Sequence, residues 1–530
     1  MIPSKGYLDY FNSRGGCPDR RQRFGESFGP NDRYRDELYM VTTASQTRGL
    51  SNGRIVALVL IVVLVVTAAV ALVTAMPRQQ TPPATSTTES SIMSTSSTIS
   101  VTSSSSGTST TTTSTSLMTS STSLTSPSNS VTTTSTSQAN PLCTSSPCAP
   151  VIAGWLHTEP GSTGVFDAAG DVVPLAGIDV DGLDFGTGNP ASSPDSCGKG
   201  WSIPPTSFTN VAAWGFNSVR IPISWENIEP DAPTLAANGT WIHHWNTAYL
   251  DELDYVVSSF SKVHVAVMFD FAQVDVSGAF KQAPEKTQGG ECEGWGNPTW
   301  LYPSITNPTT GQELASAMCS FFQDQSLVGS NAPKPIEAME AAERMLASRY
   351  AGNSTVVGID MFNEPWFDSS CGSVSYEGGL LTSFYTEMGK NISSANSRLL
   401  LIYEDSTPGL MASSPIISTA PQLQNSMYEF HIYTSDWDTA QPYVQAFLDN
   451  AKRQGVPVWM GEFDAFEAGC TGTNCELDQN WQADTQALLN YCNSNGINWA
   501  YFSYYSLGTD VQTPVPHSAI LAVLRGEIPT

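Results

Sequence analysis

Two hydrophobic periods alternate along the chain from about residue 150 onward. Short runs of β-branched and other apolar residues predict buried strands, whereas stretches whose apolar residues recur every three or four positions predict amphipathic helices. The expected strands are Val172–Ile178, Ser218–Ile223, Val263–Phe271, Thr355–Met361, Leu399–Tyr403, Met427–Ile432, Val456–Gly461 and Asn498–Ser503. The expected helices are Tyr249–Phe260, Pro335–Arg349, Gly379–Ser394, Gln441–Gln454 and Ala483–Cys492.

Eight strands separated by helices predict an α/β fold, a (β/α)8 TIM barrel with insertions that occupies residues 150–530. A doubly wound open sheet is the alternative, but no glycine-rich phosphate-binding turn follows an early strand. One connection, from Ala272 to about Lys334, is conspicuously long and rich in Gly, Pro, Trp and Cys. Such a loop is typical of an active site on a barrel.

A long apolar segment precedes the barrel. Residues 55–76 form an uncharged run of 22 residues, long enough to cross a bilayer as a helix and longer than the apolar part of a signal peptide. Residues 1–54 carry nine basic and six acidic residues, and after Arg78 no Lys or Arg occurs before Lys199. The positive-inside tendency therefore predicts a cytoplasmic N-terminal tail, a single-pass anchor in the cell membrane and an extracellular barrel.

Residues 77–149 separate this anchor from the barrel and are dominated by Ser and Thr. They have too little apolar surface to form a core, so we expect a disordered, low-complexity stalk. The whole chain has 49 acidic and 23 basic residues and a net charge of −26, and most of the acidic residues lie in the predicted outer part. Nucleic acid is not an expected partner, because phosphate binding requires clustered Lys and Arg.

Nine of the ten cysteines lie in the predicted extracellular part, where disulfides are permitted. Cys143 with Cys148, and Cys470 with Cys475, are near enough in sequence to close small loops, although spacing does not determine the connectivity. Because nine is odd, one thiol is expected to be free or paired between chains, and the candidate free thiol is Cys492, in an apolar helical pattern. No cysteine pair has a second His or Cys pair at zinc-finger spacing, so no metal is expected.

Two glutamates follow predicted strands at the place where a barrel carries its chemistry, the carboxyl ends of its strands. The apolar run at 356–361 leads to Glu364, and the run at 456–460 leads to Glu462. The 98 positions between them correspond to about three strand–helix units, which places the glutamates on the fourth and seventh strands across one mouth. Two carboxylates across a cleft suit glycoside hydrolysis, in which one is the general acid and the other stays ionised to attack the anomeric carbon. Arg220 could supply the charge that keeps the second ionised, and Tyr433 could donate a hydrogen bond to it.

Several strand ends together resemble glycoside hydrolase family 5, the cellulase-type family of the clan A retaining glycosidases. The resemblance covers roughly residues 150–525 and rests on the segments 217–222, Asn363-Glu364-Pro365, His431-Ile432-Tyr433 and Gly461-Glu462-Phe463. It implies that Glu364 is the acid/base and Glu462 the nucleophile of a double displacement, with no cofactor and no metal.

The same resemblance implies supporting roles around the sugar at the cleavage point. Asn363 would hold the sugar 2-hydroxyl, Arg220 would hold the nucleophile, and His431 and Tyr433 would flank the sugar ring. The chain also departs from the family pattern. Ala272 stands where the family usually has a His after the third strand, with Gln273 as a possible substitute.

Three aromatic residues are candidates for contacts with sugar rings. Trp366 and Trp437 follow catalytic strand ends, and large aromatic side chains can stack on sugars as well as pack in cores. Phe502 stands where the family usually has a Trp beneath the sugar. This departure, like Ala272, leaves the substrate open more than it affects the double displacement.

We therefore expect a membrane-anchored retaining β-glycosidase, an endo-β-1,4-glucanase that acts on β-linked oligo- or polysaccharide. A glycolipid hydrolase similar to endoglycoceramidase is an alternative, favoured by the long loop with Trp295 and Trp300, by Glu404 after the fifth strand and by anchorage at a membrane. A β-mannanase is a third possibility. A protein of another class, a non-catalytic sugar-binding surface protein, also fits the anchor and the stalk.

Overall fold

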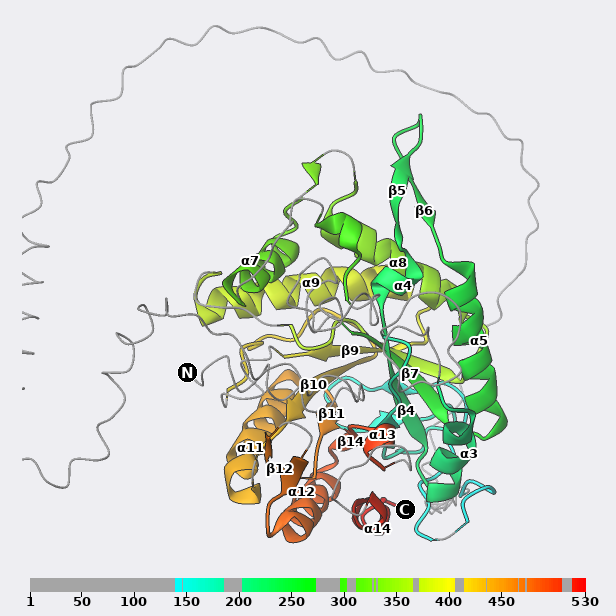
Figure 1. Ribbon diagram of the computed structural model, residues 1–530, viewed down its shortest axis with the longest axis vertical. Helices are drawn as coiled ribbons and strands as arrows, with labels where there is room; N and C mark the ends of the chain where they lie inside the picture. Colours follow the sequence, from blue (N-terminus) through cyan, green and yellow to red (C-terminus); the bar gives the residue numbers. More distant parts are fainter. Residues whose placement is uncertain are drawn as a thin grey trace, which may run out of the picture. The chain divides into compact units, whose positions relative to one another are not determined.

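Eight parallel strands close into a barrel, and helices connect and surround them (Figure 1). The barrel strands are β3 (Ala176–Asp179), β4 (Ser218–Ile223), β7 (Ala266–Phe271), β8 (Val356–Asp360), β9 (Leu400–Glu404), β10 (Ser426–Ile432), β11 (Val458–Phe463) and β14 (Asn498–Tyr501). Each strand pairs in parallel with its neighbour in chain order, and β14 pairs with β3 to close the ring. The (β/α)8 barrel and all eight predicted strands are confirmed.

The computed structural model describes residues 139–144, 146–184, 203–272, 296–302, 311–326, 328–329, 332–365, 371–405, 414–434, 436–465, 467–471, 474–507 and 517–530. Within these ranges no helix is both long enough and apolar enough to cross a membrane. The predicted cytoplasmic tail, the predicted membrane segment at 55–76 and most of the predicted stalk lie outside the described residues.

The last part of the predicted stalk belongs to the barrel domain. Asn140 is buried and its side-chain amide donates a hydrogen bond to the carbonyl of Val263, at the amino end of β7. Ala149 is fully buried, and a disulfide joins Cys143 to Cys148. The boundary predicted between residues 149 and 150 therefore falls too late, because a short polar segment without a hydrophobic period can still be held by a disulfide and by hydrogen bonds.

The helices lie outside the barrel and were predicted less completely than the strands. The helices are α3 (Pro205–Trp214), α4 (Trp225–Ile228), α5 (Thr247–Lys262), α7 (Gly311–Phe322), α8 (Pro335–Arg349), α9 (Val374–Ala395), α11 (Trp437–Gln454), α12 (Trp481–Asn495), α13 (Tyr504–Leu507) and α14 (His517–Gly526), with a 3-10 turn η3 (Thr299–Leu301). All five predicted helices are present, and α8 has the predicted bounds. The long connection after β7 contains η3 and α7, which the pattern did not reveal.

Within the described ranges, three two-stranded hairpins are added to the barrel. They are β1 (His157–Thr158) with β2 (Val165–Phe166), β5 (Asp231–Leu235) with β6 (Trp241–His244), and β12 (Glu467–Thr471) with β13 (Asn474–Leu477). The β5–β6 hairpin follows the carboxyl end of β4 and projects away from the barrel (Figure 1). In β12–β13 the backbone pairs Cys470 with Cys475, the two residues predicted to close a small loop.

Alternating side chains of the strands divide the interior into two cores. In β9, Leu401 and Tyr403 join the outer core between strands and helices, whereas Leu400 and Ile402 join an inner core within the barrel. Because side chains of a strand alternate between its two faces, the next inward position of β9 is Glu404, at the carboxyl end. The apolar inner core thus ends in a layer of polar side chains at the mouth of the barrel.

An aromatic cluster fixes the segment that follows β8. Phe362 contacts Phe322 of α7 and Phe384 of α9, with ring centroids 5.0 and 5.7 Å away, and the latter two rings are 4.9 Å apart. All three rings are buried. The Cys319–Cys371 disulfide joins α7 to the segment just before α9 at the same place.

Cys492 is buried and, as predicted, is a free thiol.

We expect Phe384→Ala to destabilise the protein strongly, because it empties this cluster. Replacing a buried Phe by Ala costs about 3–5 kcal/mol. The control is Tyr376→Ala, on the same helix but 45% exposed, for which a change within about 0.5 kcal/mol is expected. Urea unfolding followed by tryptophan fluorescence measures both. Equal losses in the two variants would contradict the role assigned to the cluster.

Candidate active site

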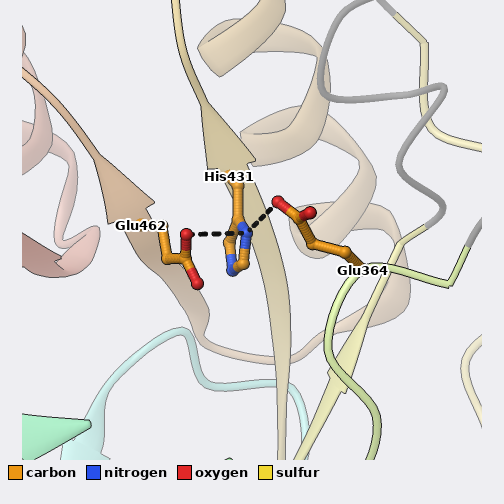
Figure 2. A group of neighbouring side chains, drawn as sticks. All are labelled: Glu364, His431 and Glu462. Atoms are coloured by element: carbon orange, nitrogen blue, oxygen red, sulfur yellow. Dashed lines mark hydrogen bonds and ion pairs between the residues drawn. The ribbon is translucent and has the colours of Figure 1, made fainter. Parts of the chain in front are cut away.

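Glu364 and Glu462 face each other at the mouth of the barrel with His431 between them (Figure 2). Glu364 lies in the loop after β8, the fourth barrel strand, and Glu462 lies in β11, the seventh, as predicted. One carboxylate oxygen of each lies within 4.8 Å of the other and of a ring nitrogen of His431. Retaining glycosidases hold their two carboxyl groups about 5–5.5 Å apart, whereas inverting enzymes need about 6.5–9.5 Å. The arrangement is therefore that of a retaining enzyme.

A β-bulge directs Glu462 into the barrel. Between β10 and β11, Phe430 pairs with Met460 but His431 pairs with Glu462, so that Gly461 is an extra residue in β11. Trp459 belongs to the inner core and Met460 to the outer one. Without the bulge, strict alternation would send residue 461 inward and residue 462 outward. The extra residue returns Glu462 to the inner face, beside His431.

Arg220 and Tyr433 hold the carboxylate of Glu462 from two sides. The Nη1 atom of Arg220 donates to Oε1 of Glu462 at 2.7 Å, and the Tyr433 hydroxyl donates to Oε2 at 2.5 Å. Burial raises the pKa of Glu462, while the positive charge of Arg220 and the hydrogen bond from Tyr433 lower it. Both side chains therefore favour the ionised form that a nucleophile requires, as the sequence predicted.

Glu364 is held in an unusual backbone conformation. Its φ angle is +46°, in the left-handed region that residues other than glycine rarely adopt and that the following Pro365 further disfavours. Its backbone N–H donates to Oε2 of Glu404, and its Oε1 lies 2.9 Å from Nδ1 of His431. Strained backbone of this kind recurs at functional sites where the surroundings hold it in place. Glu404 and His431 provide that hold here.

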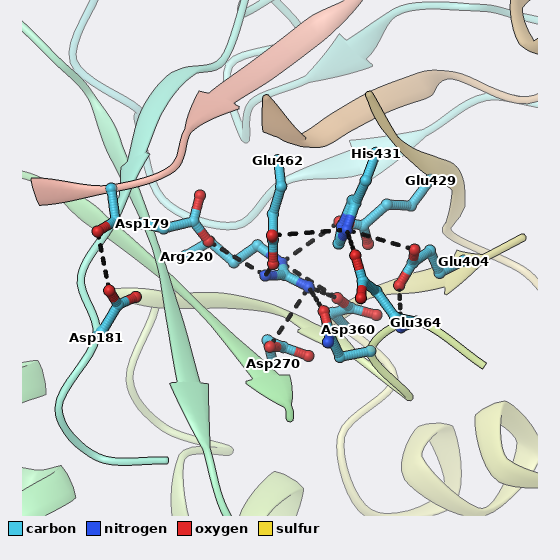
Figure 3. Close-up of polar contacts among 12 residues, drawn as sticks. Asp179, Asp181, Arg220, Asp270, Asp360, Glu364, Glu404, Glu429, His431 and Glu462 are labelled. Carbon is cyan, nitrogen blue, oxygen red and sulfur yellow. Dashed lines mark hydrogen bonds and ion pairs between the residues drawn. The ribbon is translucent and has the colours of Figure 1, made fainter. Parts of the chain in front are cut away.

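Arg220 is surrounded by more carboxyl groups than its single charge can balance (Figure 3). Besides Glu462, it lies within 4.0 Å of four buried acids on four other strands, namely Asp179, Asp270, Asp360 and Glu429. Burial raises the pKa of Asp179, Asp270 and Glu429 well above the ordinary values, even though Arg220 lowers them. Burial therefore favours the neutral form of these three carboxyl groups, in which each can donate a hydrogen bond.

The structure also describes three other predicted site residues, Asn363, Phe502 and Trp437. The side-chain carbonyl of Asn363 accepts a hydrogen bond from Nη2 of Arg220 at 2.7 Å, which joins it to the site. Phe502 follows β14, and its N–H donates to the carbonyl of Phe463, one residue after Glu462. Trp437 begins α11 and packs on Tyr491 of α12 with ring centroids 5.4 Å apart.

Two predictions concern positions at the limits of the described residues. Trp366 and Gln273 lie outside the described residues. Ala272 is buried, and its N–H donates to the carbonyls of Ile223 and Asp270. The structure therefore holds Ala272 as part of the end of β7.

Asp179 and Glu429 were missed as site residues. Asp179 is the last residue of β3 and pairs with Arg220 of β4, and Glu429 lies in β10 two residues before His431. Glu429 and His431 share the inward face of β10 because they are separated by two positions. A charged residue in phase with a predicted site residue on a buried strand is the signal that would have found it.

Among the described residues, Glu364, His431 and Glu462 form a group whose ligand atoms are close enough to surround a metal ion. Oxygen and imidazole nitrogen suit several divalent ions. The same atoms, however, already contact one another or Arg220 and Tyr433 through hydrogen bonds. The retaining reaction uses both carboxylates directly and needs no ion at this place.

Residues 185–508, more than half of the chain, match the family model of cellulases, glycosyl hydrolase family 5. The chain belongs to this family and is a retaining glycosidase. This finding excludes the alternative of a non-catalytic sugar-binding surface protein as the class of the molecule.

Proteins similar to this chain include endoglycoceramidases and an endogalactoceramidase. A stretch of 170 residues is 27% identical to endoglycoceramidase I of Rhodococcus hoagii strain 103S, covering 32% of this chain and 30% of that protein. Endoglycoceramidase II of Rhodococcus sp. in complex with ganglioside GM3 has the same fold, with a TM-score of 0.52 at 20% identity over 69% of this chain and 81% of that one. An endogalactoceramidase structure gives a TM-score of 0.52 at 19% identity over 70% and 84%.

We expect Tyr433→Phe to move the acidic limb of the pH profile of kcat/KM to higher pH. The variant removes a hydrogen bond that lowers the pKa of Glu462, so this pKa rises, and a more basic solution is needed to ionise the nucleophile. A hydrogen bond to a charged group contributes about 1.5–3 kcal/mol, which corresponds to a loss of about 10- to 150-fold on that limb.

The control for this prediction is Tyr403→Phe, which removes a buried hydroxyl bonded to Gln454 outside the barrel. Its profile is expected to match the wild type. An acidic limb that stays in place in Tyr433→Phe would show that this hydroxyl does not act on Glu462.

Proposed function

We propose that Glu462 is the nucleophile and Glu364 the acid/base of a double displacement. In the first step Glu462 attacks the anomeric carbon while Glu364 gives its proton to the leaving oxygen, and a covalent glycosyl-enzyme forms. In the second step Glu364 takes a proton from water, which attacks the same carbon and releases Glu462. The observation that carries this proposal is the close approach of the two carboxylates, within 4.8 Å, around His431.

The surrounding side chains suit these roles. Arg220 and Tyr433 hold both oxygens of Glu462, which keeps the nucleophile oriented. Because the carbonyl oxygen of Asn363 is bound to Arg220, its amide group is left to donate to the sugar 2-hydroxyl. His431 lies 2.9 Å from Glu364 and orients that carboxyl group.

Two variants test the assignment of the glutamates. Glu462→Gln is expected to lose activity by about 10⁴-fold or more, because the nucleophile is removed. Glu364→Ala should also be slow, but azide, which attacks without a general base, should restore turnover of an activated aryl β-glycoside and give a β-glycosyl azide. Glu252→Gln on α5 is the control and should keep wild-type activity.

An α-configured azide product from Glu364→Ala would show that Glu364 is the nucleophile, because azide would then displace the leaving group in a single inverting step. Rescue of Glu462→Gln rather than Glu364→Ala, again with a β-configured product, would exchange the two roles. Product configuration by proton NMR distinguishes these outcomes.

For the substrate, we propose a glycolipid in which a sugar is β-linked to a lipid alcohol. The supporting observation is the β5–β6 hairpin, which leaves the barrel at the carboxyl end of β4, the end that also carries the two glutamates. Leu235 is 57% exposed and Ile242 51% exposed on this hairpin. Its base is held where Nε1 of Trp300, from the long connection, donates to the carbonyl of Glu229. Leu235 and Ile242 thus expose apolar side chains on the two faces of a hairpin at this end of the barrel, which suits a substrate presented at a lipid surface.

The relatives add to this proposal. Endoglycoceramidase I, to which one third of the chain is similar, acts by its name on glycosylated ceramide. The chain spans only 30% of that relative's length, so the activity of the whole relative is not carried over by the match alone. The second candidate is the endo-β-1,4-glucanase expected from the sequence, which the cellulase family model favours. A β-mannanase has no specific observation in its favour.

Substitution of the hairpin separates these substrates. We expect Leu235→Ser combined with Ile242→Ser to reduce hydrolysis of a fluorescent glycosylated lipid in phosphatidylcholine vesicles by about 10-fold or more, since each large apolar side chain contributes about 1.5–3 kcal/mol when buried. Hydrolysis of a soluble aryl β-glycoside should be unchanged. Tyr255→Ser, which removes an exposed aromatic ring from α5, is the control.

A wild-type protein that cleaves soluble β-1,4-glucan and leaves the vesicle substrate intact would favour the glucanase instead. Equal losses on both substrates in the hairpin variant would point to a structural effect. Thin-layer chromatography of the released oligosaccharides measures both reactions.

We also propose that residues 55–76 anchor the protein in the cell membrane, with residues 1–54 in the cytoplasm and the barrel outside. The supporting observations are the uncharged run of 22 residues and the basic residues before it. The disulfides Cys143–Cys148 and Cys319–Cys371 fit an oxidising exterior. A tether of this kind would keep the catalytic domain near lipid substrates.

A further inference from the structure

Glu429 lies beneath the site in a space that only a glycine at position 461 leaves free. Its side chain is fully buried on the inward face of β10, two residues before His431. A Cβ atom on Gly461 would come within 1.5 Å of Oε1 of Glu429 and 2.6 Å of its Cδ. The bulge residue that turns Glu462 inward thus also forms a notch that holds the carboxyl group of Glu429.

From this notch Glu429 reaches the far side of the His431 ring. Oε1 of Glu429 lies 3.3 Å from Nε2 of His431 and 3.4 Å from Nε of Arg220. The other ring nitrogen, Nδ1, lies 2.9 Å from a carboxyl oxygen of Glu364, 3.5 Å from one of Glu404 and 3.7 Å from one of Glu462 (Figure 3). Three carboxyl groups around Nδ1, against one beside Nε2, favour a hydrogen on Nδ1.

The protonation state of His431 bears on the protonation state of Glu429. Burial lowers the pKa of His431 well below its ordinary value, and the charge of Arg220 lowers it further, which favours the neutral ring. A neutral imidazole with hydrogen on Nδ1 has a lone pair on Nε2, which needs a donor. Burial raises the pKa of Glu429 well above its ordinary value, and Asp360 beside it raises it further. A protonated Glu429 supplies that donor.

We propose that Glu429 is a positioning residue that donates a hydrogen bond from its carboxyl group to Nε2 of His431 and thereby fixes the tautomer whose Nδ1–H holds Glu364. This inference deepens the proposed function, since it rests on Glu364 as the acid/base. With Oε1 of Glu364 held by Nδ1–H, its other oxygen is directed to the leaving group and later to water. In the opposite tautomer Nδ1 would repel Glu364, and the proton-transfer geometry would be lost.

A glutamine at position 429 keeps a hydrogen-bond donor but cannot ionise, and a leucine keeps neither property, which makes the proposal testable. In Glu429→Gln the amide N–H can still donate to Nε2, so kcat on a soluble aryl β-glycoside should stay within about fivefold of the wild type. In Glu429→Leu no donor remains, and kcat should fall about 10- to 100-fold with little change in KM, as is typical for groups that orient a reacting side chain. Glu343→Gln is the matched control, because Glu343 is also fully buried but lies on α8.

Each of the two variants has an outcome that would contradict the proposal. Glutamine as inactive as leucine would overturn the donor role, and leucine as active as the wild type would overturn any positioning role. Thermal unfolding of each variant shows whether it has folded. If Glu429→Leu does not fold, Glu429→Met, with a thioether that cannot donate, takes its place.

A spectroscopic measurement tests the tautomer without turnover. In the full chain labelled with ¹⁵N-histidine, the ring nitrogens of His431, identified through a His431→Gln variant, should show protonated Nδ1 and unprotonated Nε2 at neutral pH in the wild type and in Glu429→Gln. Glu429→Leu should lose this pattern. Hydrogen on Nε2 in the wild type would overturn the inference. Because the spectrum needs no substrate, it separates failure of this inference from failure of the proposed function.

The notch supplies an independent test through Gly461. Gly461→Ala alone should lower kcat, since the new methyl group displaces Glu429. In a Glu429→Ala background the notch is empty, and the added methyl group should cost little more, apart from a small shift of Trp459, whose Nε1 would be 2.8 Å away. Additive losses would show that Gly461 and Glu429 act separately.

Discussion

The structure depends on one buried cation, the guanidinium of Arg220. A charge placed in a barrel interior is strongly unfavourable unless partners and hydrogen bonds compensate it, and Arg220 is 1% exposed. Its partners come from five other strands of the barrel, so the ion pairs join elements far apart in the chain: Asp179, Asp270, Asp360, Glu429 and Glu462. One positive charge cannot balance five negative ones in a medium of low polarity, and burial raises the pKa of Asp179, Asp270 and Glu429 well above the ordinary values. Of these acids, Glu462 alone also accepts the hydroxyl of Tyr433, which favours its ionised form.

The rigid surroundings of the two glutamates explain how their separation is maintained. Glu462 lies within a strand whose β-bulge sets the direction of its side chain. Glu364 lies in a loop whose backbone is hydrogen-bonded to Glu404 and whose residue Phe362 packs in a buried aromatic cluster. The bulge, the hydrogen bond and the packing all hold the backbone in place, and not a side chain alone. Retention of configuration depends on a spacing that differs from the inverting one by only a few ångströms. A site built on strands and buried aromatic rings can keep that spacing through both steps.

Two parts of the chain outside the active site, the β5–β6 hairpin and the segment before the barrel, bear on where the protein encounters its substrate. The β5–β6 hairpin carries exposed apolar side chains at the catalytic end of the barrel, and the sequence before the barrel has the length and charge pattern of an anchor with a stalk. Both features agree with the lipid-linked substrate proposed above, because a tether would raise the local concentration of enzyme at the surface that holds such a substrate.

The barrel, its eight strands and the places of Glu364 and Glu462 could be predicted from residue patterns, because these depend on local hydrophobic periods and on residues at strand ends. Arg220, Asn363, His431 and Tyr433 were also predicted, since they lie in or directly after the strands β4, β8 and β10. The helices α3, α7 and α14 were not predicted, nor was the packing of Trp437 on α12. Only the tertiary structure brought Glu429 into the notch of Gly461 and gathered the acids around Arg220. Such contacts join residues that are tens to hundreds of positions apart, and burial, which sets their protonation, exists only once the barrel has closed.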